Sequence, residues 1–181
     1  MTGVKFKLVL PYAGMPVIAA ALLILRFAEV EPFILLKYEL LILFGYMAAL
    51  SDLKTKRIPN RLIIAMITAW VLMMTPMLFI STDATIVYMK DSLIGLSIGG
   101  GLFLLVYVIS RKGLGGGDVK FMAAAGLYLG LGGVIPVMLY GTILAALSGL
   151  ILILLKKIGR KDTIPLAPFL YAGVLLTVFL Q

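Results

Sequence analysis

The sequence predicts an all-α membrane protein, a polytopic bundle of six to seven transmembrane helices with its N-terminus in the cytoplasm. Hydrophobic residues make up 62% of the 181 residues and charged residues 13%, whereas a soluble domain is typically about 45–50% apolar and about 25% charged. Apolar stretches recur along the chain, and several reach the roughly 20 residues needed to cross the hydrocarbon core of a bilayer. The basic residues between these stretches are unevenly distributed, as is typical of membrane proteins with a defined orientation.

Seven apolar segments follow one another along the chain. No small-residue cleavage site follows the first, so we expect a retained helix rather than a signal peptide. The fifth is short and bounded by glycines, which leaves the count at six or seven. The loops are short, so 1–181 is expected to be one membrane domain, with an extra N-terminal helix and loop over 8–33 and a core over 34–181. The segments run near 8–27, 34–51, 60–80, 88–110, 118–132, 134–156 and 163–180.

The charges predict the orientation. With the N-terminus inside, thirteen of the 16 Lys and Arg residues fall on the cytoplasmic side, as the positive-inside rule requires. The net charge of +8 is then explained by loops that face the cytoplasm, and no nucleic-acid partner is expected. On this topology the basic residues outside are Arg26, Lys37 and Lys90, the acids outside are Glu29, Glu31, Glu39, Asp83 and Asp91, and the acids inside are Asp52, Asp118 and Asp162.

The chain contains no cysteine and no histidine. This excludes disulfides, thiolate metal sites and a cysteine nucleophile, and it removes the Ser-His-Asp triad and the commonest zinc ligand. Acid–base chemistry near neutral pH is left to carboxylates, Tyr or Lys.

Asp52 ends the second apolar segment on the cytoplasmic side. A basic loop follows it, and Pro59 and Asn60 suit the start of the next helix, because proline lacks the N–H that would be unpaired there. Asp52 is therefore either a functional acid or an interfacial carboxylate paired with one of the cations Lys54, Lys56 and Arg57.

Asp118 follows a glycine-rich loop at the start of the fifth segment. Glycines such as Gly115 and Gly117 allow another backbone to approach closely. The alternative is that these glycines form a turn and that Asp118 caps a helix. Lys120 is either an interfacial anchor or a group that holds substrate. The loop lacks the Gly-Lys-Ser/Thr ending of a nucleotide-binding P-loop.

Pro165 and Pro168 open the last segment on the same side of the membrane. Two prolines three residues apart unwind a helix start and free backbone groups. Lipid does not tolerate exposed irregular backbone, so we expect this stretch to face protein or a wet cavity. A plain helix start is the alternative.

Asp52 and Asp118 together indicate a chemistry that neither indicates alone. Acids at membrane depth are costly and tend to mark function. Two facing carboxylates cannot both ionise cheaply, so one keeps a proton while the other acts as a base. Such a pair activates water against an amide, and no metal or organic cofactor is required.

At these residues the chain resembles the prepilin peptidase family of GxGD-type intramembrane aspartyl proteases. That family shows an aspartate six residues before Ile-Pro-Asn, then Gly-x-Gly-Asp-x-Lys, and often a late Ile-Pro-x-x-Pro-Phe. The corresponding stretches are Asp52 with Ile58–Asn60, Gly115–Lys120, and Ile164–Phe169.

The resemblance implies an endopeptidase of a prokaryotic cell membrane. It would remove the short basic leader from type IV prepilin-like precursors at the cytoplasmic face, with Asp52 and Asp118 as the catalytic pair. Gly115 and Gly117 carry over as loop glycines. Bifunctional members have paired cysteines linked to N-methylation, so this chain resembles a short, peptidase-only member. Its oligomeric state cannot be predicted.

Three other classes compete with the peptidase. A small transporter would also use broken helices and intramembrane acids, although it would more often show inverted repeats, which are not apparent. A divalent-metal enzyme acting on lipid phosphates would need a third acid near the pair. A structural subunit would leave both aspartates as caps and counter-ions.

Overall fold

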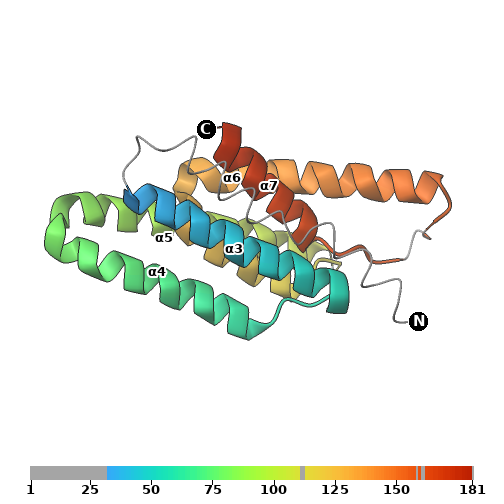
Figure 1. The fold of residues 1–181 in the computed structure, drawn as a ribbon. Helices are drawn as coiled ribbons and strands as arrows, with labels where there is room; N and C mark the ends of the chain where they lie inside the picture. The colour runs from blue at the N-terminus through green and yellow to red at the C-terminus, as the bar shows by residue number, and fades with distance from the viewer. Residues whose placement is uncertain (1–31, 111–112, 158, 160–161, 181) are drawn as a thin grey trace.

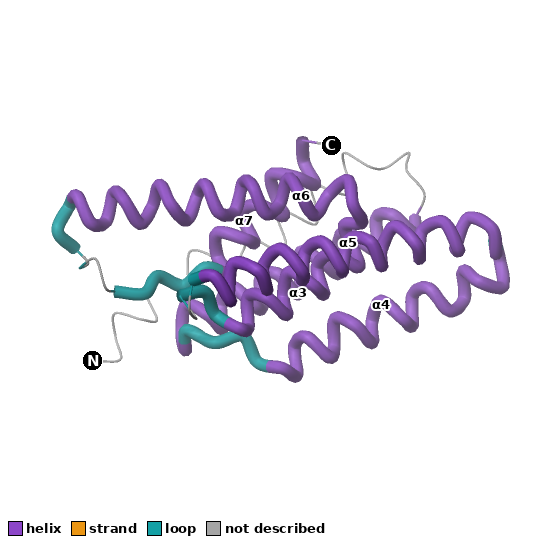
Figure 2. Tube along the Cα trace, turned by 180° about the vertical axis from the view of Figure 1, so that it is seen from behind, coloured by secondary structure: helices purple, strands orange, loops and turns teal. Residues whose placement is uncertain are grey.

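A computed structural model describes residues 32–110, 113–157, 159 and 162–180. Within these ranges the chain is entirely helical and contains no strand (Figures 1 and 2). The helices are α3 (Pro32–Thr55), α4 (Asn60–Ile80), α5 (Thr82–Ile109), α6 (Gly116–Leu154) and α7 (Ala167–Leu180).

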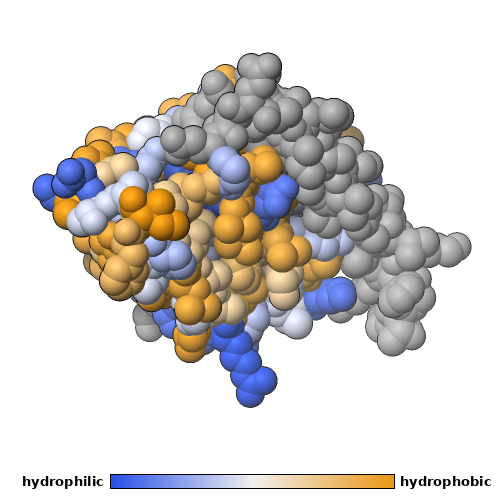
Figure 3. Space-filling view, turned by 60° about the vertical axis from the view of Figure 1, so that its left-hand side comes forward, coloured by the Kyte–Doolittle hydropathy of each residue, from blue (hydrophilic) through white to orange (hydrophobic). Residues whose placement is uncertain are grey.

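The surface of the bundle is apolar, as a bilayer requires. Helices α3 to α6 are each long and apolar enough to cross a membrane, and α7 is a shorter apolar helix. Large side chains such as Leu72 and Phe79 are 67% and 86% exposed, and hydrophobic residues cover much of the face in Figure 3. A soluble monomer does not expose apolar surface on this scale. The chain is therefore a helical membrane protein.

Some predictions fall outside the described residues. The first apolar segment, 8–27, is one of them, and so is nearly all of the N-terminal unit 8–33. The number of membrane crossings, the division of the chain at residue 33 and the cytoplasmic N-terminus therefore remain predictions.

Most expected segments match a helix, with one informative difference. The segment 60–80 coincides with α4, whereas α5 begins at Thr82, six residues earlier than predicted. Asp83, Lys90 and Asp91 therefore lie on a helix, and their assignment to the outer side stays a prediction. The reason is that a backbone in lipid must satisfy its own N–H and C=O groups, so the helix continues through polar residues.

Helix α6 is interrupted at Gly130, which has φ 66° and ψ −170°. This left-handed conformation costs glycine little and other residues more. We call 116–129 the first arm and 131–154 the second arm. The prediction of two segments, 118–132 and 134–156, thus corresponds to two arms of one helical element.

The first arm runs parallel to α4. Near the start of both elements Lys120 donates to Asn60, and further along Tyr128 donates to the backbone oxygen of Met66. Tyr128 and Met66 are fully buried, so this contact belongs to the core of the bundle.

The second arm runs in the opposite direction to the first. Gly141 packs against Leu170 of α7, and Gly173 of α7 packs against Val137, so the second arm and α7 are antiparallel. Since α7 begins at the same end of the bundle as the first arm, the second arm returns to that end (Figure 1). The end of α3 and the starts of α4, α6 and α7 therefore meet at one end of the molecule.

Candidate active site

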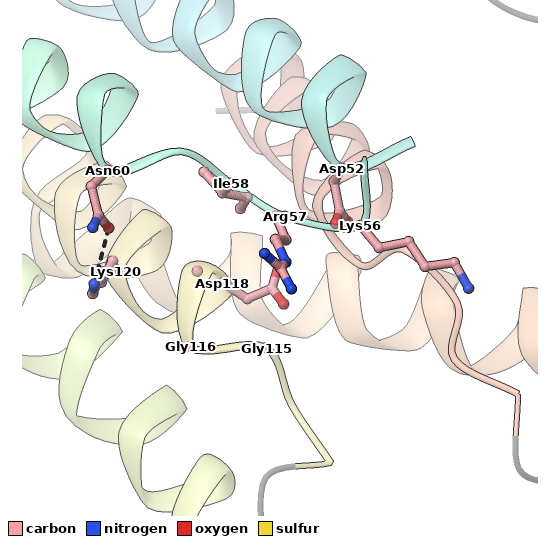
Figure 4. A pocket seen from close by; sticks show the side chains of 10 residues that line it. Asp52, Lys56, Arg57, Ile58, Asn60, Gly115, Gly116, Asp118 and Lys120 are labelled. Atoms are coloured by element: carbon pink, nitrogen blue, oxygen red, sulfur yellow. Dashed lines mark hydrogen bonds between the residues drawn. The ribbon is translucent and has the colours of Figure 1, made fainter. Parts of the chain in front are cut away.

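A cavity of about 330 Å³ opens at this end of the bundle. Two of the three predicted motif segments contribute to its wall, and Figure 4 shows their side chains around it. The lining residues are Asp52, Lys56, Arg57, Ile58, Asn60, Gly115, Gly116, Gly117, Asp118 and Lys120.

Asp52 lies in the last turn of α3 and is 6% exposed. Its Oδ2 accepts a hydrogen bond from the backbone N–H of Ala167 at 3.0 Å. Ala167 is the first residue of α7, where N–H groups lack helical partners. Pro165 and Pro168 flank this donor. The third motif segment, Ile164–Phe169, thus contacts Asp52 through its backbone, although it is not part of the cavity lining.

Lys56 does not neutralise Asp52 by a direct hydrogen bond. Its Nζ donates instead to the backbone oxygen of Thr163 at 2.9 Å and to Thr163 Oγ1 at 3.3 Å. Its backbone is left-handed, with φ 52°. This contact ties the segment before α7 to the turn after α3, and so stabilises the position of the Ala167 donor.

The turn that follows Asp52 is braced by side chains. Ser51 Oγ and Thr55 Oγ1 both donate to the backbone oxygen of Arg57, at 2.8 Å and 3.2 Å. The bracing fixes the loop that carries Arg57 and Ile58 along the cavity wall.

Asp118 is the third residue of α6 and is 8% exposed. It does not act as a cap: Gly115 occupies the N-cap position, and no side chain caps the helix. Its Oδ1 is buried, and no partner is found for it among the described residues. An unpaired buried acceptor costs about 1–3 kcal/mol, and such an atom in a native structure calls for a functional explanation.

The alternating glycines before Asp118 have separate steric roles. A Cβ on Gly115 would lie 2.6 Å from Asp118 Oδ2, and a Cβ on Gly117 would lie 3.2 Å from the Cβ of Ile58. The intervening Gly116 is nearly free, since its closest neighbour would be Tyr107 Cε2 at 4.0 Å. Gly115 thus makes room for the carboxylate, and Gly117 lets the loop after α3 approach.

Lys120 joins two of the motif segments. Its Nζ donates to Asn60 Oδ1 at 3.0 Å across the cavity wall. Asn60 is the first residue of α4, and Pro59 before it is extended, with φ −70° and ψ 138°. The proline ends the loop, and the asparagine is thereby held against the first arm of α6.

The predicted residues lie close together, with two exceptions. Pro59 faces a neighbouring apolar groove between α3 and α4, and the Pro165–Pro168 segment lies behind Asp52. Sequence reasoning missed Ala167 entirely, because a backbone donor leaves no side-chain signal. It also treated Lys56 and Arg57 only as partners for Asp52, and it did not assign Ile58 to the cavity wall.

The two carboxylates share one cavity and influence each other electrostatically. No third Asp, Glu, His or Cys joins them in the part of the chain that the structure describes. Two buried carboxylates that line one cavity large enough for water could hold a water molecule between them and exchange protons with it. The residues present offer a metal ion few ligands.

Comparison with known proteins identifies the family. Residues 39–154 match the type IV leader peptidase family, a range that includes Asp52 and Asp118 and ends before Pro165. The chain is 28% identical over 137 residues to a prepilin leader peptidase/N-methyltransferase of Xanthomonas campestris pv. campestris, covering 72% of this chain and 45% of that protein. It is 27% identical over 132 residues to the protein of the same description from Bacillus subtilis, covering 71% of this chain and 49% of the relative.

The chain spans about half the length of these curated relatives. No solved structure matches it. The family match nevertheless covers well over half of the chain, and it includes both carboxylates of the cavity. This helical membrane protein therefore belongs to the type IV leader peptidase family.

Proposed function

We propose that this chain is an intramembrane aspartyl endopeptidase that removes the short basic leader from type IV prepilin-like precursors. The observation that carries the proposal is the pair Asp52 and Asp118, which come from separate helices and line one cavity. The named relatives support the class of substrate.

In the proposed mechanism, one carboxylate accepts a proton from water as the water oxygen attacks the scissile carbonyl carbon. The other, initially protonated, donates its proton to the carbonyl oxygen. Collapse of the tetrahedral intermediate re-forms a C=O bond and breaks the C–N bond: the leaving amine takes up the proton that the base acquired, and one hydroxyl of the intermediate returns its proton to the other carboxylate, which restores the starting pair. The carboxylates act as a pair, so their titration is shared between them.

The scissile segment must be extended, because a helical amide is shielded by its own turn. The loop over 56–58 and the glycines over 115–117 offer backbone on two sides of the cavity. Lys120 Nζ already donates to Asn60, and this favours a role for Lys120 in holding the two walls of the cavity together. The peptide would lie between these walls, and no cofactor enters the mechanism.

The proposed location is a prokaryotic cell membrane with the cavity facing the cytoplasm. Basic residues gather at the cavity end, among them Lys54, Lys56, Arg57 and Arg61, as the positive-inside rule requires of a cytoplasmic face. We propose peptidase activity without N-methylation, because the chain contains no cysteine pair.

The test is co-expression of a type IV pilin-like precursor with wild type, Asp52→Asn and Asp118→Asn. Asparagine keeps the size of aspartate but cannot cycle a proton. Mass spectrometry reads the mature N-terminus and detects any methyl group on it. Asp83→Asn is the matched control, because Asp83 is an exposed acid on α5 that lies outside the cavity lining.

We expect wild type and the control to cut at the leader junction and both cavity variants to accumulate in the membrane without cutting. Cleavage near the wild-type level by either cavity variant would disprove the pair. If wild type cuts no precursor of this class, the transporter becomes the leading alternative.

A further inference from the structure

The length of the first arm places the expected depth of the reversal at Gly130 within the hydrocarbon core, where lipid offers no hydrogen-bond partner. The first arm is about 20 Å long at about 1.5 Å per residue, which is short of the roughly 30 Å hydrocarbon core. A break there frees the N–H groups that open the second arm, and apolar surroundings require that each be satisfied.

Asp91 of α5 supplies the missing acceptor. Its Oδ1 accepts a hydrogen bond from the backbone N–H of Leu131 at 3.0 Å, at the first residue of the second arm. Its Oδ2 lies where a Cβ on Gly130 would be, so a larger residue at Gly130 would displace the carboxylate. Asp91 is about 13 Å along its helix from Thr82, at about 1.5 Å per residue, so it is a deeply placed acid of the kind that usually has a role.

The same carboxylate is coupled to α3. Its charge acts on Lys37 and Tyr38 near the start of that helix, and Lys37 Nζ lies 5.0 Å from the centre of the Tyr38 ring. Asp52, in the last turn of α3, and Asp118, in the first turn of the first arm, both lie at the cavity. Asp91 thus contacts the far end of the first arm directly, and its charge also acts at the far end of α3.

We infer that Asp91 is a positioning residue, which holds the reversal at Gly130 and thereby sets Asp118 against Asp52. The first arm is a continuous helix between the reversal and the cavity, so a shift at Gly130 moves Asp118 with it. Only the activity readout of this inference rests on the proposed function.

The test compares Asp91→Asn with Asp91→Leu. Asparagine keeps an oxygen that can accept from Leu131, whereas leucine has a similar size and no acceptor. Asp83→Leu is the control for removing an acid from α5, because Asp83 is exposed in the first turn. Asp91→Leu leaves the backbone N–H of Leu131 without this acceptor, which shifts the conformational equilibrium away from the native reversal by about 10-fold or more.

The position of the first arm is read by cross-linking. The chain has no cysteine, so Asn60→Cys with Lys120→Cys introduces a single thiol pair at a contact that spans 3.0 Å in the wild type. A short bifunctional thiol-reactive cross-linker then reports whether the first arm still lies beside α4. Cleavage of the precursor is measured separately, without the two cysteines.

We expect Asp91→Leu to lower both the cross-linking yield and the cleavage rate by about 10-fold or more, and Asp91→Asn and Asp83→Leu to stay within about 3-fold of wild type. Wild-type cross-linking and cleavage in Asp91→Leu would overturn the inference, and so would equal losses in the Asn and Leu variants.

If Asp91→Leu does not accumulate, Gly130→Ala is used instead, because the added Cβ would force the Asp91 carboxylate away from the reversal. Gly101→Ala is its control, because a Cβ there meets no atom within 4 Å. Wild-type behaviour of Gly130→Ala overturns the inference in the same way. If wild type cleaves no precursor, the proposed function fails while cross-linking still decides the role of Asp91.

Discussion

Substitution of Gly115 by alanine isolates the geometry of the Asp118 carboxylate. The backbone of Gly115 is extended, with φ −72° and ψ 133°, so alanine fits it without strain. The new Cβ would lie 2.6 Å from Asp118 Oδ2, and the pair must separate to at least 3.4 Å to reach ordinary contact. The oxygen therefore moves by about 1 Å, a misplacement that costs about 100-fold in rate, or roughly 2.7 kcal/mol of transition-state stabilisation.

The two neighbouring glycines provide matched comparisons. Gly116→Ala meets only Tyr107 Cε2 at 4.0 Å, so its rate should stay within about 2-fold, and its helix should gain roughly 0.5–1 kcal/mol in stability. Gly117→Ala would be 3.2 Å from Ile58 Cβ, and a shift of a few tenths of an ångström predicts an intermediate loss of about 10-fold.

The assay is single-turnover cleavage of a reconstituted precursor, with thermal unfolding followed by the fluorescence of the single tryptophan, Trp70. We expect the cleavage rates to rank Gly116→Ala above Gly117→Ala and Gly117→Ala above Gly115→Ala, with unfolding temperatures at or above that of wild type for Gly116→Ala. If Gly115→Ala cleaves as fast as Gly116→Ala, the steric account of the glycine pattern is refuted.

Two further predictions concern the walls of the cavity, and a third concerns metal dependence. Lys56→Met should lower the cleavage rate about 10-fold, because loss of the hydrogen bond to Thr163 releases the segment that carries the Ala167 N–H, the donor to Asp52. The control Lys54→Met, which changes a nearby exposed lysine, should match wild type in the same assay. The effects of Lys120→Met and Asn60→Ala on the free energy of unfolding should be non-additive in a double-mutant cycle, with a coupling energy of about 0.5–1.5 kcal/mol. Strict additivity would show that their contact does not contribute to stability. EDTA should leave the cleavage rate unchanged, since no step uses a metal, and a loss restored by a divalent ion would favour the metal enzyme.

The local features of the site were predictable because they depend on short stretches of chain. The end of a helix shortly after Asp52, the helix start after Pro59 and the glycine-bounded start of the first arm all follow from turn and helix chemistry within a few residues. The choice of Asp52 and Asp118 followed from the absence of histidine and cysteine and from the cost of acids at membrane depth.

The long-range contacts were not predictable in this way. Ala167 donates to Asp52 across 115 residues of sequence, and the donor is a backbone N–H that every residue except proline possesses. The hydrogen bond from Leu131 to Asp91 was not predicted either, because a hydropathy pattern does not show which distant segments of the chain meet.

Composition and local pattern therefore determined that this protein lies in a membrane and is helical, and they selected the candidate site residues. Only the tertiary structure decided that α6 reverses at Gly130, that Asp91 satisfies the reversal, and that α7 presents its first amide to Asp52. The physical reason is that hydropathy and turn preference act over a few neighbouring residues. A hydrogen bond between distant segments depends on how the helices pack, and packing is a property of the whole chain.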